Sequence, residues 1–302
     1  MTRWPVAAGA ALAVLFGAMA PALSQPAAES SPGISTPFGR LSAVTTDLGD
    51  GLYTVSAGGA RTVFLVGDDG VLVGDPITPE AARAILAEIR KVTDKPIKYM
   101  VYSHQHWDHT LGGQVFKDEG AEIWSHEACL VHFYRSPHPN VVLPDRTFQI
   151  KHVLDVGNAK AELLYFGPNH SDCTTFLYFP ANKTVHIVDT VQPYAVSGAG
   201  GLMNDSYPKL FVDSLQMLED NVPFERMVPG HGGPSAPREA VTIRREYQQA
   251  LLDAVKAEMD KGTPNDQVAK NISLPQFKDL QGYDQYLTAN AQRIFIYYRI
   301  GW

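Results

Sequence analysis

Short apolar runs separated by turn residues characterise the chain from Leu52 onward. Branched and alternating apolar residues predict strands over residues 52–56, 61–66 and 71–74. The segments 56–60 and 67–70 between them are rich in glycine and aspartate, which predicts hairpin connections. A second set of short strands is expected between Arg146 and Val188.

Helical periodicity predicts a second class of elements. Residues 79–91 form the clearest case, with Thr78 as N-cap and Pro79 at the first helical position. Ile85, Leu86 and Ile89 would then face a sheet. Further helices are expected over residues 208–219, 237–261 and 284–298.

The N-terminus is expected to be a targeting segment. Arg3 is the only charged residue before Glu29, and an uninterrupted run of apolar and small residues extends from Val6 to Ala20. This run is short for a membrane span, which needs roughly 20 residues. Small residues around position 24 fit a cleavage point, so we predict a signal peptide over 1–24. A flexible leader over 25–40 and a single domain over 41–302 would follow.

The densest chemical feature is the sequence His104-Gln105-His106-Trp107-Asp108-His109, directly after the apolar stretch 97–101. Histidine suits zinc and related ions, and a carboxylate adds compensating charge. A helix would distribute these side chains around its axis, whereas a loop leaving a strand can turn them inward together. We therefore predict that this loop supplies metal ligands.

Three further candidate ligands each follow a short apolar run near glycine or proline. They are His170, Asp189 and His231. Because each would leave a strand, all three are expected to open onto one edge of the structure. Five histidines and two aspartates suffice to hold two divalent ions about 3.5–4 Å apart, with Asp189 between them.

The loop resembles the His-x-His-x-Asp-His signature of the metallo-β-lactamase-fold hydrolase superfamily. The resemblance extends from residues 51–75 to the helix after His231. It implies an α/β fold, a four-layer αββα sandwich of two sheets with helices outside both. It also implies the ligand assignment: His104, His106 and His170 for the first metal, Asp108, His109 and His231 for the second, and Asp189 as the bridge.

The bridging aspartate is similar to that of glyoxalase II and the acyl-homoserine lactonases, whereas β-lactamases of the Cys-ligand type carry cysteine there. By this resemblance we expect an exported hydrolase that uses two divalent ions, most simply Zn²⁺, to cleave a small ester, lactone or amide with metal-bound hydroxide. Asp108 would relay a proton, and Tyr194 would hold the substrate oxygen, as a tyrosine does in the lactonases. The alternatives are a β-lactamase, a mononuclear iron enzyme of the persulfide dioxygenase type, and a metal-binding protein without turnover.

The charge of the chain limits the kinds of molecule that we expect it to bind. The net charge is −7, and the basic residues are scattered, with Arg244-Arg245 as an adjacent pair expected on a solvated helix face. An acidic chain without a basic stripe argues against nucleic acid. We expect a small-molecule substrate, no stable membrane association after signal cleavage, and a periplasmic or secreted location.

Two polar positions remain open. Cys129 and Cys173 could form a disulfide, stay as buried thiols, or contribute to the site, because their separation in space is unknown from sequence. Asp75 ends the strand predicted over 71–74 and could orient a ligand imidazole through its second ring nitrogen, or simply begin a turn before Pro76.

Overall fold

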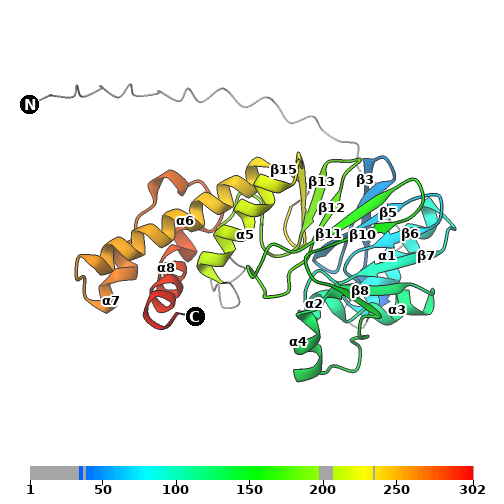
Figure 1. Ribbon diagram of the computed structural model, residues 1–302, viewed down its shortest axis with the longest axis horizontal. Helices are drawn as coiled ribbons and strands as arrows, with labels where there is room; N and C mark the ends of the chain where they lie inside the picture. The colour runs from blue at the N-terminus through cyan, green and yellow to red at the C-terminus, as the bar shows by residue number, and fades with distance from the viewer. Residues whose placement is uncertain (1–33, 37–38, 197–206, 234, 302) are drawn as a thin grey trace, which may run out of the picture.

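The computed structural model describes residues 34–36, 39–196, 207–233 and 235–301. The predicted signal peptide and the glycine-rich segment 197–201 lie outside these residues. Two large sheets dominate the rest (Figure 1). The first sheet pairs, in this order, β3 (Ala43–Gly49), β4 (Leu52–Ala57), β5 (Ala60–Val66), β6 (Val71–Val73), β7 (Ile97–Val101), β8 (Glu122–His126) and β9 (Arg146–Phe148).

The second sheet also follows chain order. Its strands are β10 (Lys151–Asp155), β11 (Lys160–Leu164), β12 (Phe176–Phe179), β13 (Thr184–Ile187), β14 (Arg226–Pro229) and β15 (Ala236–Pro237). In the first sheet the strands pair antiparallel up to β6 and parallel from β6 to β9. In the second sheet β13 and β14 form the one parallel pair among the described strands, and the other pairs are antiparallel. Parallel neighbours need a long crossover, and helices supply it.

Helices cover the outer faces of the two sheets. On the first lie α1 (Pro79–Val92), α3 (Gly113–Asp118) and α4 (Cys129–Arg135), with the short α2 (Trp107–Thr110) at the sheet edge; on the second lie α5 (Pro208–Asn221) and α6 (Glu239–Asp260). A separate cluster at the C-terminus joins α6 to α7 (Asn265–Val268), the 3-10 turns η1 (Ala269–Asn271) and η2 (Pro275–Phe277), and α8 (Tyr283–Ile300).

The layer order follows from the burial pattern. Leu52 and Val63 of the first sheet share a buried cluster with Leu163 and Val228 of the second. The alternate side chains of each sheet pack against helices instead. Because successive residues of a strand point to opposite faces, each sheet is apolar on both sides. The αββα sandwich is confirmed.

Helix α1 shows how local sequence produces one of these layers. The Thr78 hydroxyl accepts a hydrogen bond from the Ala81 amide, and Pro79 occupies the first turn. Ile85 and Ile89 are fully buried against the first sheet. The prediction for this helix is confirmed, including its cap and its buried face.

Three features go beyond the sequence analysis or differ from it. At the end of the predicted leader, β1 (Ile34–Thr36) and β2 (Gly39–Leu41) pair as an antiparallel ribbon, and the leader over 25–40 stays a prediction. Strand β3 was not anticipated, because its sequence is largely polar and only partly buried. Arg244 does not lie on a solvated face: it is 4% exposed and packs over the rings of Phe211 and Tyr247, since α6 is buried on that side.

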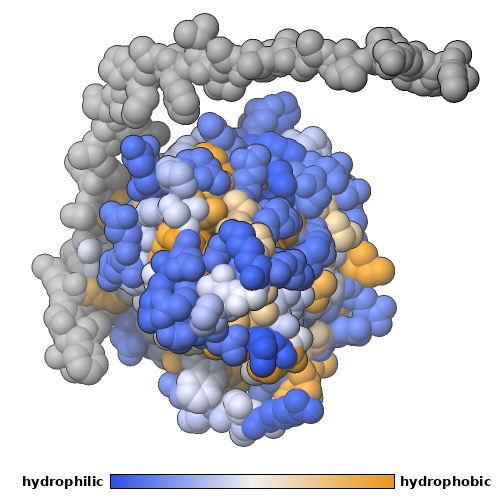
Figure 2. Space-filling model, turned by 90° about the vertical axis from the view of Figure 1, so that its left-hand side faces the viewer, coloured by the Kyte–Doolittle hydropathy of each residue, from blue (hydrophilic) through white to orange (hydrophobic). Residues whose placement is uncertain are grey.

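The C-terminal helices present a largely hydrophilic outer surface. Figure 2 views the molecule from this end, and polar residues cover most of it, with apolar residues scattered among them. Among the described residues, no helix combines the length and apolar character needed to cross a membrane.

Candidate metal centre

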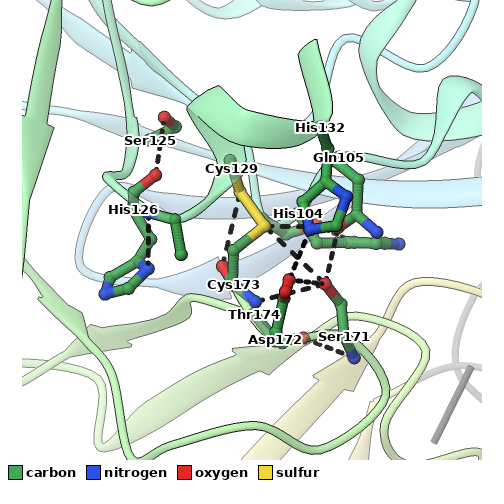
Figure 3. Close-up of a disulfide and its surroundings, with 12 residues drawn as sticks. His104, Gln105, Ser125, His126, Cys129, His132, Ser171, Asp172, Cys173 and Thr174 are labelled. Carbon is green, nitrogen blue, oxygen red and sulfur yellow. Dashed lines mark hydrogen bonds and ion pairs between the residues drawn. A yellow bond between two sulfur atoms is a disulfide. The ribbon is translucent and has the colours of Figure 1, made fainter. Parts of the chain in front are cut away.

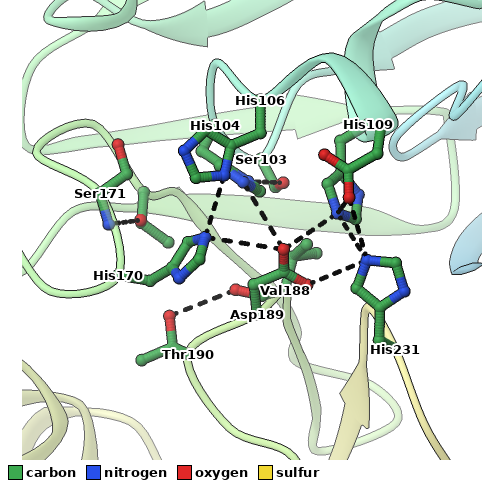
Figure 4. A network of polar contacts seen from close by, with 12 residues as sticks. Ser103, His104, His106, His109, His170, Ser171, Val188, Asp189, Thr190 and His231 are labelled. Atoms are coloured by element: carbon green, nitrogen blue, oxygen red, sulfur yellow. Dashed lines mark hydrogen bonds and ion pairs between the residues drawn. The ribbon is translucent and has the colours of Figure 1, made fainter. Parts of the chain in front are cut away.

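The candidate ligands gather at one edge of the sandwich (Figure 4). The loop after β7 carries the histidine-rich motif, the loop after β11 carries His170, and Asp189 and His231 follow β13 and β14. Strands β13 and β14 are parallel neighbours, so their carboxyl ends deliver Asp189 and His231 to the same place. The structure thus brings together all seven residues that the sequence nominated.

We name the first set group one. It consists of His104, His106, His170 and Asp189. The Nε2 atoms of His104 and His170 lie 3.8 and 3.6 Å from Asp189 Oδ2. His106 enters with Nδ1, 3.1 Å from His170 Nε2. The His104 side chain is fully buried, and that of His170 is 14% exposed.

We name the second set group two. It consists of Asp108, His109, Asp189 and His231. His109 Nε2 lies 3.1 Å from both Asp189 Oδ2 and His231 Nε2. His231 Nε2 is 3.3 Å from Asp108 Oδ2. The side chains of Asp108 and His231 are 59% and 40% exposed, so this group faces solvent.

Both groups fit a divalent ion. Four ligands at bonds of about 2.0–2.1 Å in a tetrahedron lie roughly 3.3 Å from one another, close to the separations above. The Nε2 atoms of His109 and His231 lie 3.1 Å apart, so their lone pairs would repel each other unless a proton or a cation lay between them. His104 Nε2 and Asp189 Oδ1 are buried without a hydrogen-bond partner among the described residues. A pair of ions would satisfy these atoms.

Asp75 contacts a ligand of each group, directly or through Ser103. Its Oδ2 lies 3.2 Å from His109 Nδ1, and its two oxygens accept hydrogen bonds from the amide and hydroxyl of Ser103 at 2.7 and 2.6 Å. The Ser103 hydroxyl in turn lies 2.9 Å from His104 Nδ1 and can accept its proton. This relay leaves Nε2 of both imidazoles free to bind a metal. The orienting role expected of Asp75 is consistent with this geometry, whereas the part of Ser103 was missed.

Electrostatics favour the metal-binding forms in group one. Burial, together with the neighbouring His109 and His170, lowers the pKa of His104 well below its usual value. The Asp189 carboxylate is also buried, yet the hydrogen bond from His109 and the charges of the imidazoles hold its pKa below the usual range. A neutral imidazole and an ionised carboxylate are the forms that bind metal ions.

Protons are held more firmly in group two when no ion is bound. Burial opposes protonation of His109, but hydrogen bonds to Asp189 and Asp75 outweigh it and raise the His109 pKa well above the usual value. The hydrogen bond between His231 and Asp108 raises the pKa of the imidazole and lowers that of the carboxyl. A metal entering this group would displace those protons.

Asn169 links the loops that carry His170 and Asp189, and sequence reasoning missed it. Its Oδ1 accepts hydrogen bonds from the amide of His170 at 2.5 Å and from the Thr190 hydroxyl at 3.3 Å. Its Nδ2 donates to Ser214 of α5 at 3.0 Å. Asn169 is fully buried. The signal in the sequence was an asparagine directly before a predicted ligand; that it is buried and hydrogen-bonded is seen only in the structure.

The bridging position places special demands on the backbone. Asp189 adopts a φ of 58°, a left-handed conformation that aspartate tolerates better than most residues. Gly230 lies directly against it: a Cβ there would come within 2.5 Å of Val188 and 3.0 Å of Asp189 Oδ1. A side chain at position 230 would therefore displace the bridge.

The two cysteines form a disulfide behind group one (Figure 3). Cys129 lies at the start of α4, and Cys173 follows the His170 loop, with Cα atoms 5.3 Å apart. Nearby, His132 of α4 contacts Asp172 at 2.6 Å. Of the three possibilities left open by sequence, the structure shows the disulfide, and it ties the His170 loop to α4.

Tyr194 lies on the segment after the bridge. Its side chain is 46% exposed, its φ is 56°, and its carbonyl accepts a hydrogen bond from the Gln281 amide. Its expected contact with a substrate oxygen stays a prediction. Trp107, inside the motif, is 47% exposed, and its ring packs at a tilt against that of His138, with ring centroids 4.7 Å apart.

Known proteins match this arrangement. The family model of the metallo-beta-lactamase superfamily matches residues 56–231. The chain is 30% identical over 143 residues to the 2,4-dinitroanisole O-demethylase subunit alpha of Nocardioides sp. (strain JS1661), covering 46% of this chain and 44% of that protein. It is 24% identical over 267 residues to the linear primary-alkylsulfatase of Pseudomonas sp. (strain ATCC 19151), covering 72% of this chain and 50% of that protein. The chain thus spans about half the length of these two relatives.

Solved structures show the same fold. A metallo-beta-lactamase from Pontibacter korlensis aligns with a TM-score of 0.59 at 18% identity, over 68% of this chain and 99% of its own. A stereoselective inverting sec-alkylsulfatase from Pseudomonas sp. aligns with a TM-score of 0.72 at 18% identity, over 85% of this chain and 50% of its own. With the family model covering more than half of the residues and the ligand-bearing loops all inside or at the end of that match, the chain belongs to the metallo-beta-lactamase superfamily.

Proposed function

We propose that this protein is a hydrolase that holds two divalent metal ions, by preference zinc, and cleaves a small ester, lactone or amide. The observation that carries the proposal is the sharing of Asp189 by two groups, each with its ligand atoms within 4.8 Å of one another. Two ions bound there would supply an activated water at neutral pH and would polarise a substrate carbonyl.

Side chains of the chain itself would orient the metal ligands, transfer a proton and bind the substrate. Asp75 contacts His109 directly and reaches His104 through Ser103, which would hold these two imidazoles in one tautomer. Asp108, exposed at the solvent side of group two, is placed to carry a proton to the leaving group. Tyr194 is proposed to hold the substrate oxygen. The substrate is a small molecule that reaches the exposed side of group two, and neither nucleic acid nor a membrane surface is required.

A second candidate substrate is an alkyl sulfate. The sec-alkylsulfatase structure aligns over 85% of this chain, whereas the metallo-beta-lactamase structure aligns over 68%. The alkylsulfatase therefore shares a larger part of this chain's structure. A linear primary-alkylsulfatase is also among the curated relatives. The same polarising site would then act on a sulfate ester in place of a carboxylic ester.

We further propose that residues 1–24 are removed as a signal peptide and that the mature protein acts in the periplasm or outside the cell. The buried disulfide supports this, because such bonds persist in oxidising compartments. N-terminal sequencing of the protein from its native host should begin within a few residues of Gln25. A start at Met1 in a membrane fraction would contradict the proposal.

The test of function is a substrate panel on zinc-loaded protein, with Asp189→Ala as the matched inactive control. We expect kcat/KM for an ester, a lactone or an alkyl sulfate to exceed that for any penicillin or carbapenem by at least about tenfold, equivalent to ~1.4 kcal/mol. Efficient carbapenem cleavage without esterase, lactonase or sulfatase activity would make the protein a β-lactamase. Oxygen consumption by an iron-loaded sample would instead indicate an oxygenase.

A further inference from the structure

A pocket of about 320 Å³ adjoins group two on the side of His231. It is lined by Ser42, Val44, Ser56, Ala57, Gly58, Gly59, Ala60, Arg61 and Gly232. It shares its walls with the metal centre, because Gly59 O lies 3.2 Å from His231 Nδ1 and Ala60 pairs with His231 as an isolated bridge. A molecule in this pocket would therefore lie beside a proposed metal ligand.

Arg61 is the one charged residue of this lining, and no counterion lies beside it in the part of the chain that the structure describes. None of the lining residues is acidic, although the chain as a whole has 32 acidic and 25 basic residues. Among the described residues Arg61 forms no ion pair. Its guanidinium makes one long hydrogen bond, 3.4 Å to the Thr54 hydroxyl, and its Nε is buried without a partner. Burial lowers its pKa, which reflects a partly desolvated cation without compensation.

The strand register places the Ser56 hydroxyl beside Arg61. Arg61 of β5 is directly opposite Ser56 of β4, and Ser56 is opposite Val44 of β3. Cross-strand partners project on the same face of a sheet, so the Ser56 hydroxyl and the Arg61 side chain stand next to each other. The Arg61 amide, in turn, donates to Gly230 O at 2.7 Å, which holds this strand end against the His231 loop.

We propose that this pocket binds an oxyanion, a carboxylate or sulfonate group carried by the substrate at a distance from its scissile bond. Burying a guanidinium without a neighbouring negative charge costs free energy. Two metal ions bound nearby would raise this cost by repulsion, and an anion bound beside Arg61 would lower it. Guanidinium groups and hydroxyls are the donors that recognise such oxyanions. The assignment of the anion to a substrate rests on the proposed function, whereas the binding of an oxyanion does not.

The first experiment compares two p-nitrophenyl esters with five-carbon acyl groups, the neutral pentanoate and the hemiglutarate, which ends in a carboxylate. In Arg61→Gln we expect kcat/KM for the hemiglutarate to fall about tenfold to a hundredfold, and that for the pentanoate to stay within about twofold. Ser56→Ala should cost the hemiglutarate about threefold. Arg61→Lys should retain part of the selectivity. An equal fall for both esters would mean that Arg61 only supports the fold, and would overturn the proposal.

The second experiment does not depend on catalysis. Inorganic sulfate is titrated calorimetrically into the zinc-loaded full chain and into Arg61→Gln, with Arg146→Gln as control. Arg146 is an exposed cation paired with Glu122, so its loss changes net charge equally. We expect sulfate affinity to fall at least about tenfold in Arg61→Gln and to be unchanged in Arg146→Gln. Equal binding by wild type and Arg61→Gln, as sulfate held by zinc alone would give, overturns the proposal. If Arg61→Gln lost sulfate binding while the wild-type protein cleaved no substrate of the panel, the anion site would be established and the hydrolase function refuted.

Discussion

The two ligand groups share Asp189 but are surrounded differently. Group one is enclosed: the His104 side chain is fully buried, that of His170 is 14% exposed, and a disulfide lies behind them. Group two is open, with Asp108 and His231 at 59% and 40% exposed. Enclosure holds ligands in place before an ion arrives, whereas exposure leaves room for substrate and water.

This difference suggests a division of roles. Group one is expected to bind its ion more tightly, because burial keeps His104 in the neutral form that binds metal, and Ser103 and Asn169 hold the loops of His104 and His170 in place. Group two must first lose the protons shared by His109, His231 and Asp108, which weakens binding as pH falls. The predictions below test this asymmetry.

Loss of the shared ligand should have the largest effect. In Asp189→Ala both groups lose a carboxylate, so we expect metal affinity at both sites to fall more than about a hundredfold, beyond the effect of removing an outer-shell partner. Elemental analysis after dialysis should show well under one equivalent of metal per chain, against two for wild type. Retention of two ions and full activity would contradict the bridge.

Single-group variants should separate the two sites. His170→Ala is expected to weaken group one and Asp108→Ala to weaken group two, each by about a hundredfold at its own site and much less at the other. Competition titrations with a chelating dye would measure the two affinities. If both variants lost the same ion, the assignment of ligands to two groups would be wrong.

Asp75→Asn should affect both groups more mildly. The variant keeps the shape of the side chain but removes the charge that supports His109 and, through Ser103, His104. We expect metal affinity to fall about tenfold to a hundredfold. Loss at only one site would show that the Ser103 relay does not operate.

Removal of the disulfide should lower stability more than it lowers metal affinity. Cys129 and Cys173 are 44 positions apart, and a closed loop of that size restricts the unfolded chain by about 4 kcal/mol. The double variant Cys129→Ala/Cys173→Ala should unfold at lower denaturant concentration and lose about threefold to tenfold in affinity at group one, because the His170 loop is freed on one side. An equal loss at group two would argue against a local brace.

Tyr194→Phe should have the smallest effect on the metal centre. If the hydroxyl holds a substrate oxygen, we expect kcat/KM to fall about tenfold with metal content unchanged, which is the contribution of one hydrogen bond. Unchanged kinetics for every substrate cleaved would remove Tyr194 from the site. Steady-state kinetics and metal analysis on the same preparation decide between these outcomes.

Much of the site was predictable because its signals are local. The histidine motif and the apolar runs before His170, Asp189 and His231 are continuous in sequence, and strand ends place such residues at a common edge. Helix α1 was equally predictable, since Thr78 and Pro79 are adjacent to the apolar periodicity that they begin.

Sequence by itself therefore determined the alternation of strands and helices, the ligand types and their order along the chain. Only the tertiary structure decided the contacts between distant residues that no strand-end pattern announces. The pairing of Cys129 with Cys173 and the buried setting of Arg244 depend on distances between elements that no local pattern encodes. The unpaired Arg61 beside His231 is of the same kind, because a missing counterion becomes visible only when every neighbour in space is known.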